Sequence, residues 1–447
     1  MEQAIYITPV GLMVFAIVGL LTIGLKREYA FVPIILLACF FTLGERLLIF
    51  GFNFTVLRML LIVTWVRILA RKELSRVEFN AVDKVIILYG VLSIVMNFLL
   101  ERTGASLQNR FGLVYDVFGV YFFFRAVIRD IGDVERFIKS LAIILFPLVI
   151  LMSFEKLTGR NLFAVFGGVA EFSGVRDGSL RVQGPFRHPI LAGTFGATVM
   201  PFFVGLWFTG RNRFFSVLGF SASTAISLLA ASSGPVIAYV GGFSAIFLWR
   251  FRENMRAIRW SILGLLIATH MAMKAPIWYL IGRFSLIFGG TGWHRSDLID
   301  QAVKHFSEWW LLGTTYTAHW AEHSCLITLP DVPNMVDITS QYILIGVNGG
   351  VFPIMAFIAI ISYGFREVGR SWRYTEPVLP DSAMLIWTLG CALLGHTLSF
   401  TSVSYFDQLN VFWWGLTAMI ASTSQFALQF EYVQSEDEAC SLVHAHA

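Results

Sequence analysis

The side chains best suited to chemistry gather in one polar stretch, residues 282–340, of an otherwise apolar chain. Two arginines of this stretch, Arg283 and Arg295, are suited to holding an anion, because a guanidinium matches the geometry of phosphate oxygens. An imidazole or a carboxylate can accept the proton of an attacking hydroxyl, which is the role of a general base. The candidate bases, in order of preference, are Asp337, His323 and His319.

A second group of cations precedes a predicted membrane helix, in the segment RVQGPFRHPILAGTFG that begins at Arg181. Pro189 fits the first turn of that helix, where its missing N–H is not needed for helical hydrogen bonds. The free N–H groups and the positive end of the helix dipole would then lie beside Arg181 and Arg187, an arrangement that binds phosphate well. Alternatively, the two arginines extend to the headgroup level and bind lipid phosphate without a specific role.

Further polar side chains complete a candidate substrate-binding set. Thr339 and Gln341 lie with Asp337 at the mouth of the next predicted membrane span, where polar groups are costly to bury without a role. The candidate substrate-binding residues are Arg187, His188, Arg283, Trp293, His294, His319, Thr339 and Gln341. The small-residue turn Ser232-Ser233-Gly234 has no His or Asp beside it in sequence, so we expect it to serve helix packing.

The sequence predicts no metal ion and no other cofactor. His319 and His323 are the only histidines of the polar stretch at helical spacing, and their surroundings show no firm helical pattern. The four cysteines lie far apart and form neither a CxxC pair nor another metal-ligand spacing. Neither a zinc site nor a disulfide framework is therefore indicated.

Composition identifies the class of protein. Of the 447 residues, 56% are hydrophobic and only 14% are charged, and the mean hydropathy is +0.70. These values are far outside the range of soluble domains and indicate a polytopic membrane protein. The formal net charge of +4 is small, and the Lys and Arg lie in short clusters between apolar runs. Nucleic acid is therefore not an expected partner.

Apolar runs of about 17 to 25 residues can cross a bilayer as helices, and we predict about 12 or 13 of them. The expected fold is all-α, with a single transmembrane domain over residues 1–430 and a polar, acidic, disordered cytoplasmic tail over 431–447. The predicted spans lie near 4–25, 29–44, 47–68, 83–100, 108–127, 135–154, 188–208, 213–231, 233–250, 260–278, 340–364, 382–399 and 405–428.

Short loops rich in Lys and Arg mark the cytoplasmic side of a membrane protein. Such clusters occur near 67–76, 125–139, 211–213, 250–259 and 366–373. They fall in alternate loops, which places two long polar loops, 155–187 and 279–339, on the extracytoplasmic face. Both loops nevertheless carry arginines, which suggests a bound anion. Alternatively, these arginines pair with the nearby carboxylates Glu155, Glu171, Asp177, Asp297 and Asp300.

The later loop contains a predicted amphipathic helix. Apolar residues recur at helical spacing between Ser296 and Leu312. Ser296 is suited to cap this helix, with Asp297 and Asp300 in its first turn. We expect the helix to lie at or above the outer membrane interface.

With these segments in this order, the chain resembles the O-antigen ligase and Wzy polymerase superfamily of bacterial cell-envelope proteins. The resemblance covers about residues 150–365 by motif and the whole chain by topology. It rests on Arg181, Gly184, His188 and Pro189; on Ser232, Ser233 and Gly234; on Arg295 ahead of Leu312-Gly313; and on Thr339-Ser340 with Tyr342 and Gly350. The DITSQY and WHR versions of these motifs are similar to those of exopolysaccharide polymerases.

The resemblance implies a metal-independent, inverting glycosyltransferase of the C-type (GT-C-like) membrane architecture, in the bacterial inner membrane with its active site facing the periplasm. Such an enzyme moves a glycan from an undecaprenyl diphosphate carrier to a hydroxyl of an acceptor glycan. Arg181 and Arg295 occupy the positions that hold the diphosphate and stabilise it as a leaving group. The ligases have a His where this chain has Thr339, so the resemblance favours a polymerase of lipid-linked repeat units, with Asp337 as the substitute base.

Two other functions remain open at this stage. A ligase would transfer the glycan to lipid A core, and a lipid-linked glycan transporter or flippase would leave the covalent structure of its substrate unchanged. The partners that the resemblance implies are the lipid-linked glycan, the acceptor glycan, membrane lipids, and a chain-length regulator with other polysaccharide-assembly proteins.

Overall fold

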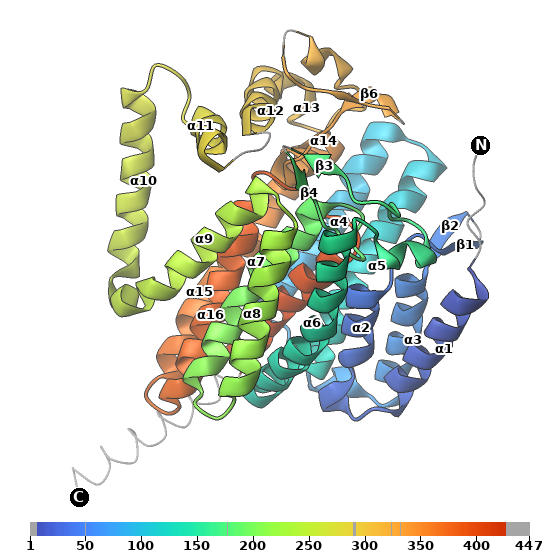
Figure 1. Cartoon of the computed structure of the whole chain (residues 1–447). Helices are drawn as coiled ribbons and strands as arrows, with labels where there is room; N and C mark the ends of the chain where they lie inside the picture. The colour runs from blue at the N-terminus through green and yellow to red at the C-terminus, as the bar shows by residue number, and fades with distance from the viewer. Residues whose placement is uncertain are drawn as a thin grey trace, which may run out of the picture.

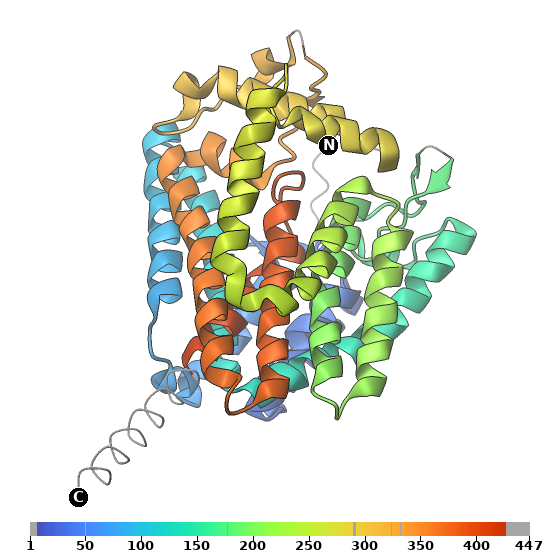
Figure 2. The same ribbon diagram turned by 90° about the vertical axis from the view of Figure 1, so that its left-hand side faces the viewer.

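The structure is a computed structural model that describes residues 7–49, 51–176, 178–288, 292–322, 324–330 and 332–425. A bundle of long helices forms its main body, and a smaller group of short elements covers one end of the bundle (Figures 1 and 2). We call this smaller group, formed by the described residues of 279–336, the cap. The predicted tail, 431–447, lies outside the described residues.

The first half of the chain forms α1 (Pro9–Gly24), α2 (Val32–Phe40), the antiparallel hairpin of β1 (Arg46–Ile49) and β2 (Phe52–Thr55), α3 (Val56–Ala70), α4 (Ala81–Glu101), α5 (Gly104–Val127), α6 (Ile131–Thr158) and the hairpin of β3 (Val175–Arg176) and β4 (Ser179–Leu180). Then come α7 (Pro189–Phe208), α8 (Arg213–Leu229), α9 (Ser233–Phe247), the 3₁₀ helix η4 (Leu248–Asn254) and α10 (Met255–Ala272).

The cap contains α11 (Tyr279–Phe288), α12 (Gly292–Lys304), α13 (Phe306–Trp309), the 3₁₀ helix η5 (Ala318–Ala321) and the hairpin of β5 (Thr328–Leu329) and β6 (Val332–Val336). The chain returns to the bundle with α14 (Gln341–Gly349), α15 (Val351–Thr375) and α16 (Pro380–Ser399). Residues 409–425 form one more helix.

The described part of the chain is mostly helical, and 6 of its helical segments are long and apolar enough to cross a membrane. They are α4, α6, α7, the continuous stretch Ser233–Ala272, α15 and α16, and α7 is the most buried of them. The apolar helices α1 and α8 are shorter. These features support the prediction of an all-α membrane protein.

Several predicted spans differ from the observed elements. The spans predicted at 233–250 and 260–278 fall in the one continuous helical stretch Ser233–Ala272, which ends before residue 278. The span predicted at 47–68 begins with the β1–β2 hairpin, and its helix starts only after Thr55, whose side chain accepts a hydrogen bond from the backbone N–H of Arg58. The span predicted at 340–364 is divided at Gly350, which has a φ of 77°. A Cβ at Gly350 would lie 2.2 Å from the carbonyl oxygen of Leu311. The cap therefore contacts the bundle at this break, where only glycine fits.

Two pairs of oppositely charged side chains lie inside the bundle. Arg125 and Asp83 are both buried and lie 2.9 Å apart, and Tyr121 donates a further hydrogen bond of 2.7 Å to Asp83. Arg67 and Glu73 form a second buried pair at 3.1 Å. Pairing is the usual condition for keeping a charge away from water.

We predict that Arg125→Met lowers the stability of the protein by about 3–5 kcal/mol, because the buried carboxylate of Asp83 loses its cation. The matched control is Arg160→Met, which breaks the half-exposed pair of Arg160 with Glu171 and should cost under about 1 kcal/mol. Thermal unfolding of the purified protein in detergent measures both changes. Equal losses for the two variants would contradict the assignment of a buried, structural pair.

Candidate functional site

A cavity of about 700 Å³ lies where the bundle meets the cap. Its lining comes from the β3–β4 segment, the beginnings of α7 and α9, the end of α8, α12 of the cap, and two stretches around residues 337–339 and 402–406. The charged and imidazole groups in this lining are Arg176, Arg181, His188, Arg295 and Asp337. Among the described residues, three arginines and one carboxylate therefore line a single space.

A buried carboxylate organises the loop that carries Arg176 and Arg181. Glu155, at the end of α6, accepts hydrogen bonds from the backbone N–H groups of Gln183 (3.0 Å) and Gly184 (2.9 Å) and from the hydroxyl of Ser173 (2.7 Å). These bonds fold the loop back against the bundle. The Nη2 of Arg181 then reaches the hydroxyl of Ser232, at the start of α9, over 2.6 Å.

The beginning of α7 contributes a neutral imidazole. His188 is the N-cap residue of this helix, and its Nδ1 accepts a hydrogen bond of 3.1 Å from the backbone N–H of Ile190. Partial burial and the positive charges of Arg181 and Arg176 lower the pKa of His188 to about 4. An imidazole whose Nδ1 accepts carries its proton on Nε2, so His188 is neutral near pH 7 and keeps one N–H donor.

Arg295 lies on the cap side of the cavity and is only 5% exposed. The Nε of Arg295 is buried and has no hydrogen-bond partner among the described residues. A Cβ at Gly234 would lie 3.2 Å from Arg295 Nη2, so the guanidinium packs against the first turn of α9. Burial and the charges of Arg176 and Arg181 lower the pKa of Arg295 to about 10. The guanidinium stays cationic at pH 7, in surroundings that favour a bound anion.

Asp337 and Thr339 line the cavity beyond the end of β6. The backbone N–H of Asp337 donates to the carbonyl of Ile327 (2.9 Å), and the carbonyl of Asp337 lies 3.3 Å from Nε2 of His294 on α12. The exposed carboxylate can therefore meet a molecule in the cavity. The hydroxyl oxygen of Thr339 is buried and has no hydrogen-bond partner within the described structure.

The remaining predicted site residues do not line this cavity. Arg187 pairs with Asp407 at 3.0 Å, and the side-chain oxygen of Gln341 accepts a hydrogen bond of 2.6 Å from the backbone N–H of Tyr405. His319 contacts Glu308 at 2.9 Å. Arg283 is exposed on α11, Trp293 packs against Gly282, and His323 lies outside the described residues.

Several of the nearby carboxylates have partners outside the cavity. Glu171 pairs with Arg160, and Asp300 pairs with Lys304 at 2.7 Å. Asp297 accepts a hydrogen bond from the backbone N–H of Cys325. Asp177 lies outside the described residues. The alternative prediction, that the loop arginines pair with nearby carboxylates, therefore holds for Arg160. No such pair is seen for the buried Arg295 in the described structure.

The amphipathic helix predicted from Ser296 to Leu312 begins earlier and ends earlier than expected. α12 runs from Gly292 to Lys304, so Ser296 lies inside it and its hydroxyl bonds to the carbonyls of Trp278 (3.0 Å) and Gly292 (3.1 Å). Its apolar residues Leu298 and Ala302 pack in a small core that the cap shares with Ile338 and with α14. The helix that carries Arg295 is therefore anchored on α14 as well as within the cap.

Sequence reasoning did not select Arg176, Ser232 and Ser402, which also line the cavity. Arg176 was only one of several arginines in its loop. Ser232 lacks a neighbouring acid or base in sequence, and its contact with Arg181 spans 51 residues. Ser402 follows α16 in a stretch without any motif.

No protein-family model matches the chain, and no curated protein matches its sequence. The cavity is therefore the basis for assigning a function. Its lining offers three guanidinium groups, one neutral imidazole N–H and the starts of two helices to an anion. The carboxylate of Asp337 and the hydroxyls of Ser232, Ser402 and Thr339 offer hydrogen bonds to an uncharged polar group.

We predict that inorganic diphosphate binds this cavity and raises the thermal unfolding temperature of the purified protein. A ligand at 100 times its Kd adds about 2.7 kcal/mol of stability. Arg295→Ala and Arg181→Ala should each weaken binding at least about tenfold, because each removes a charge-assisted contact.

The matched control for this binding is Arg160→Ala, since Arg160 lies in the same loop as Arg181 but pairs with Glu171. It should keep the full stabilisation by diphosphate. A shift of equal size in all three arginine variants would place the anion elsewhere.

Proposed function

We propose that this protein is a membrane glycosyltransferase that polymerises undecaprenyl-diphosphate-linked oligosaccharide repeat units on the outer face of the bacterial inner membrane. The observation that carries the proposal is the single cavity in which Arg176, Arg181 and Arg295 face Asp337. A diphosphate leaving group requires the arginines, and a sugar hydroxyl that attacks requires a base. The resemblance of the motifs to the O-antigen ligase and Wzy polymerase superfamily supports the same chemistry.

The arginine side of the cavity suits the diphosphate. In the transfer step, the bond between the anomeric carbon and the diphosphate oxygen breaks and negative charge develops on that oxygen. Arg295 is buried before the reaction begins, so its charge is already placed and little water has to rearrange. The N–H groups at the starts of α7 and α9 add fixed positive potential at the same end.

The opposite side of the cavity suits the acceptor. The acceptor hydroxyl forms the new bond to the anomeric carbon and gives its proton to a base. Asp337 is exposed within the cavity lining and is the only carboxylate that the described residues contribute to it. Thr339, which stands where the ligases have His, contributes a hydroxyl beside Asp337. This arrangement supports Asp337 as the general base.

The membrane side of the cavity suits a lipid carrier. Leu228 at the end of α8 and Val236 and Tyr239 at the beginning of α9 line it. α10 stands apart from the bundle beside α9 (Figures 1 and 2), and none of its residues is buried. An isoprenoid chain lying between lipid and these helices would bring its diphosphate to the arginines without leaving the apolar phase.

The test is a polymerisation assay with purified protein and lipid-diphosphate-linked repeat units. Wild-type protein should give a ladder of longer lipid-linked glycans. Arg295→Ala should lower the rate by about 10² to 10³, because it removes one stabilising donor of the leaving group. Asp337→Asn should lower it by about 10² to 10⁴ through loss of the base. Arg160→Ala should leave the rate unchanged.

Other outcomes of the assay distinguish the alternative functions. Product on added lipid A core would identify a ligase. Movement of the lipid-linked glycan across proteoliposomes, with its covalent structure unchanged, would identify a flippase. An undiminished ladder from both Arg295→Ala and Asp337→Asn would overturn the mechanism.

The orientation is testable with Cys325, which is exposed in the cap, whereas Cys39 and Cys391 are buried. In a variant whose other cysteines are replaced by serine, a membrane-impermeant maleimide should label Cys325 in intact spheroplasts. Partial burial and the carboxylate of Asp297 raise the pKa of the Cys325 thiol to about 11, so labelling needs mildly alkaline buffer. Arg211→Cys, between α7 and α8 at the opposite end, should react only after permeabilisation; the reverse pattern would place the cap inside.

A further inference from the structure

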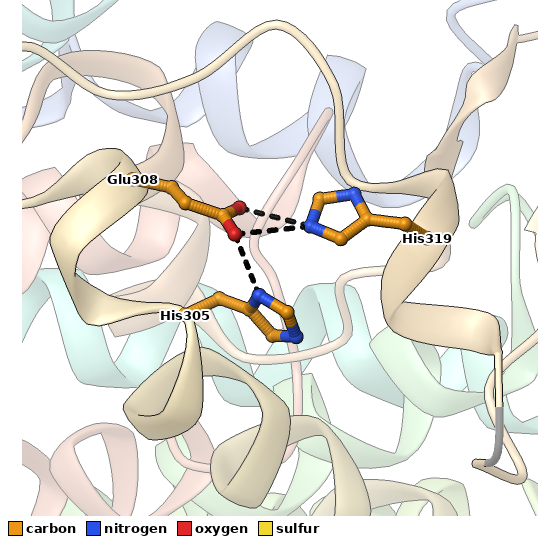
Figure 3. A group of neighbouring side chains, drawn as sticks. All are labelled: His305, Glu308 and His319. Carbon is orange, nitrogen blue, oxygen red and sulfur yellow. Dashed lines mark hydrogen bonds and ion pairs between the residues drawn. The ribbon is translucent and has the colours of Figure 1, made fainter.

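Three side chains of the cap, His305, Glu308 and His319, point toward one another (Figure 3). Nδ1 of His305 lies 2.6 Å from Oε1 of Glu308, and Nε2 of His319 lies 2.9 Å from Oε2 of the same carboxylate. One ligand atom from each residue lies within 4.8 Å of the others. None of the three lines the arginine cavity.

The backbone brings this group together from two segments. His305 and Glu308 lie on one helical turn, since the N–H of Glu308 donates to the carbonyl of His305 over 3.0 Å. His319 lies 11 residues after Glu308, in η5. The group therefore joins the end of α12 to a separate part of the cap.

Aromatic contacts fix the orientation of both imidazoles. The ring of His305 is stacked on Trp320 with 18° between the planes, and Tyr316 is stacked on His319 at 8°. Trp320 is completely buried. Rings held in this way lose little conformational freedom on binding a ligand, which favours a preorganised site.

We propose that His305, Glu308 and His319 bind a divalent transition-metal ion of the Zn²⁺ type. Two imidazole nitrogens and one carboxylate suit Zn²⁺ and its neighbours, whereas Mg²⁺ and Ca²⁺ prefer oxygen ligands alone. Tetrahedral bonds of about 2.0–2.2 Å separate ligand atoms by about 3.4 Å, so the observed atoms need to move by about 1 Å or less. The side chains of the two histidines are 28% and 26% exposed, which gives the ion a path from solvent and leaves room for a water ligand.

The ion would act as a structural link within the cap. Thr317, two residues before His319, donates its backbone N–H to the carbonyl of Asn334 (2.9 Å), and its hydroxyl accepts from the N–H of Val336 (3.0 Å). Both partners belong to β6, which leads directly to Asp337. The metal would therefore connect the helix of Arg295 to the strand that positions Asp337.

The experiment uses the full-length protein, purified in detergent with a tag that contains no histidine and stripped with a chelator. Calorimetric titration with Zn²⁺ alone should give one ion per chain with a Kd of micromolar or below. His305→Ala, Glu308→Gln and His319→Ala should each weaken binding at least tenfold, whereas His270→Ala, on the unpacked α10, should not. Co²⁺ should give visible absorption bands of a four-coordinate site in wild-type protein only.

A second measurement keeps the result independent of folding and of any transferase activity. Thermal unfolding without metal should be similar for wild-type and Glu308→Gln protein, and Zn²⁺ should stabilise only the wild type. Mg²⁺ should stabilise neither. Wild-type protein that takes up no stoichiometric Zn²⁺, or variants that bind it as tightly as wild type, would overturn the metal site and leave a hydrogen-bonded group of three residues.

Discussion

The structure depends on one constraint, that a charge removed from water needs a partner of opposite sign or hydrogen bonds that satisfy it. The bundle satisfies it with protein groups, since Arg125 lies against Asp83 and Arg67 against Glu73. Arg295 is as deeply covered as these arginines, at 5% exposure, but the described structure gives its Nε no acceptor. Burying a guanidinium in this way costs free energy that an anionic ligand would restore. The contrast between these paired arginines and Arg295, whose buried Nε has no acceptor in the described structure, supports a binding role for Arg295.

Two carboxylates near the cavity, Glu155 and Asp407, stabilise the segments that surround it. Glu155 accepts hydrogen bonds from two backbone N–H groups and a serine hydroxyl. These bonds fix the loop of Arg176 and Arg181, and they satisfy the carboxylate of Glu155 within that loop. Asp407, which stabilises Arg187, lies in the return loop before the last described helix. Glu155 and Asp407 thus stabilise the segments around the cavity through bonds to groups that lie outside it. His188 adds a donor without adding charge, because its Nδ1 is occupied by the first turn of α7.

The sequence predicted the helical membrane class and the cavity residues Arg181, His188, Arg295, Asp337 and Thr339, because hydrophobic runs, a proline at a helix start and polar groups at a span mouth each have a local physical cause. The predictions from sequence that were wrong concern features that depend on residues far apart in the chain. At Gly350, where the predicted span breaks, the carbonyl of Leu311 lies against the glycine and leaves no room for a Cβ. The roles of Arg187 and Gln341 depend on Asp407 and Tyr405, which are more than 60 residues away. The periodic pattern of a single sequence cannot predict contacts between residues so far apart.

The same non-local contacts determine how the cap and the bundle can act together. Arg181 belongs to a loop fixed to the bundle by Glu155, and Arg295 belongs to a cap helix that contacts the first turn of α9 through Gly234. A diphosphate held by both guanidinium groups would therefore bridge the two bodies, and its binding energy would bring Asp337 and the leaving group into one enclosed space. Because the cavity lies at the end of the bundle beside apolar helices, the arginines of the proposed enzyme would act in a medium of low dielectric constant, while the acceptor would still arrive from water. A site at this boundary could bind a lipid-linked diphosphate through strong electrostatic interactions and still admit a sugar hydroxyl from water.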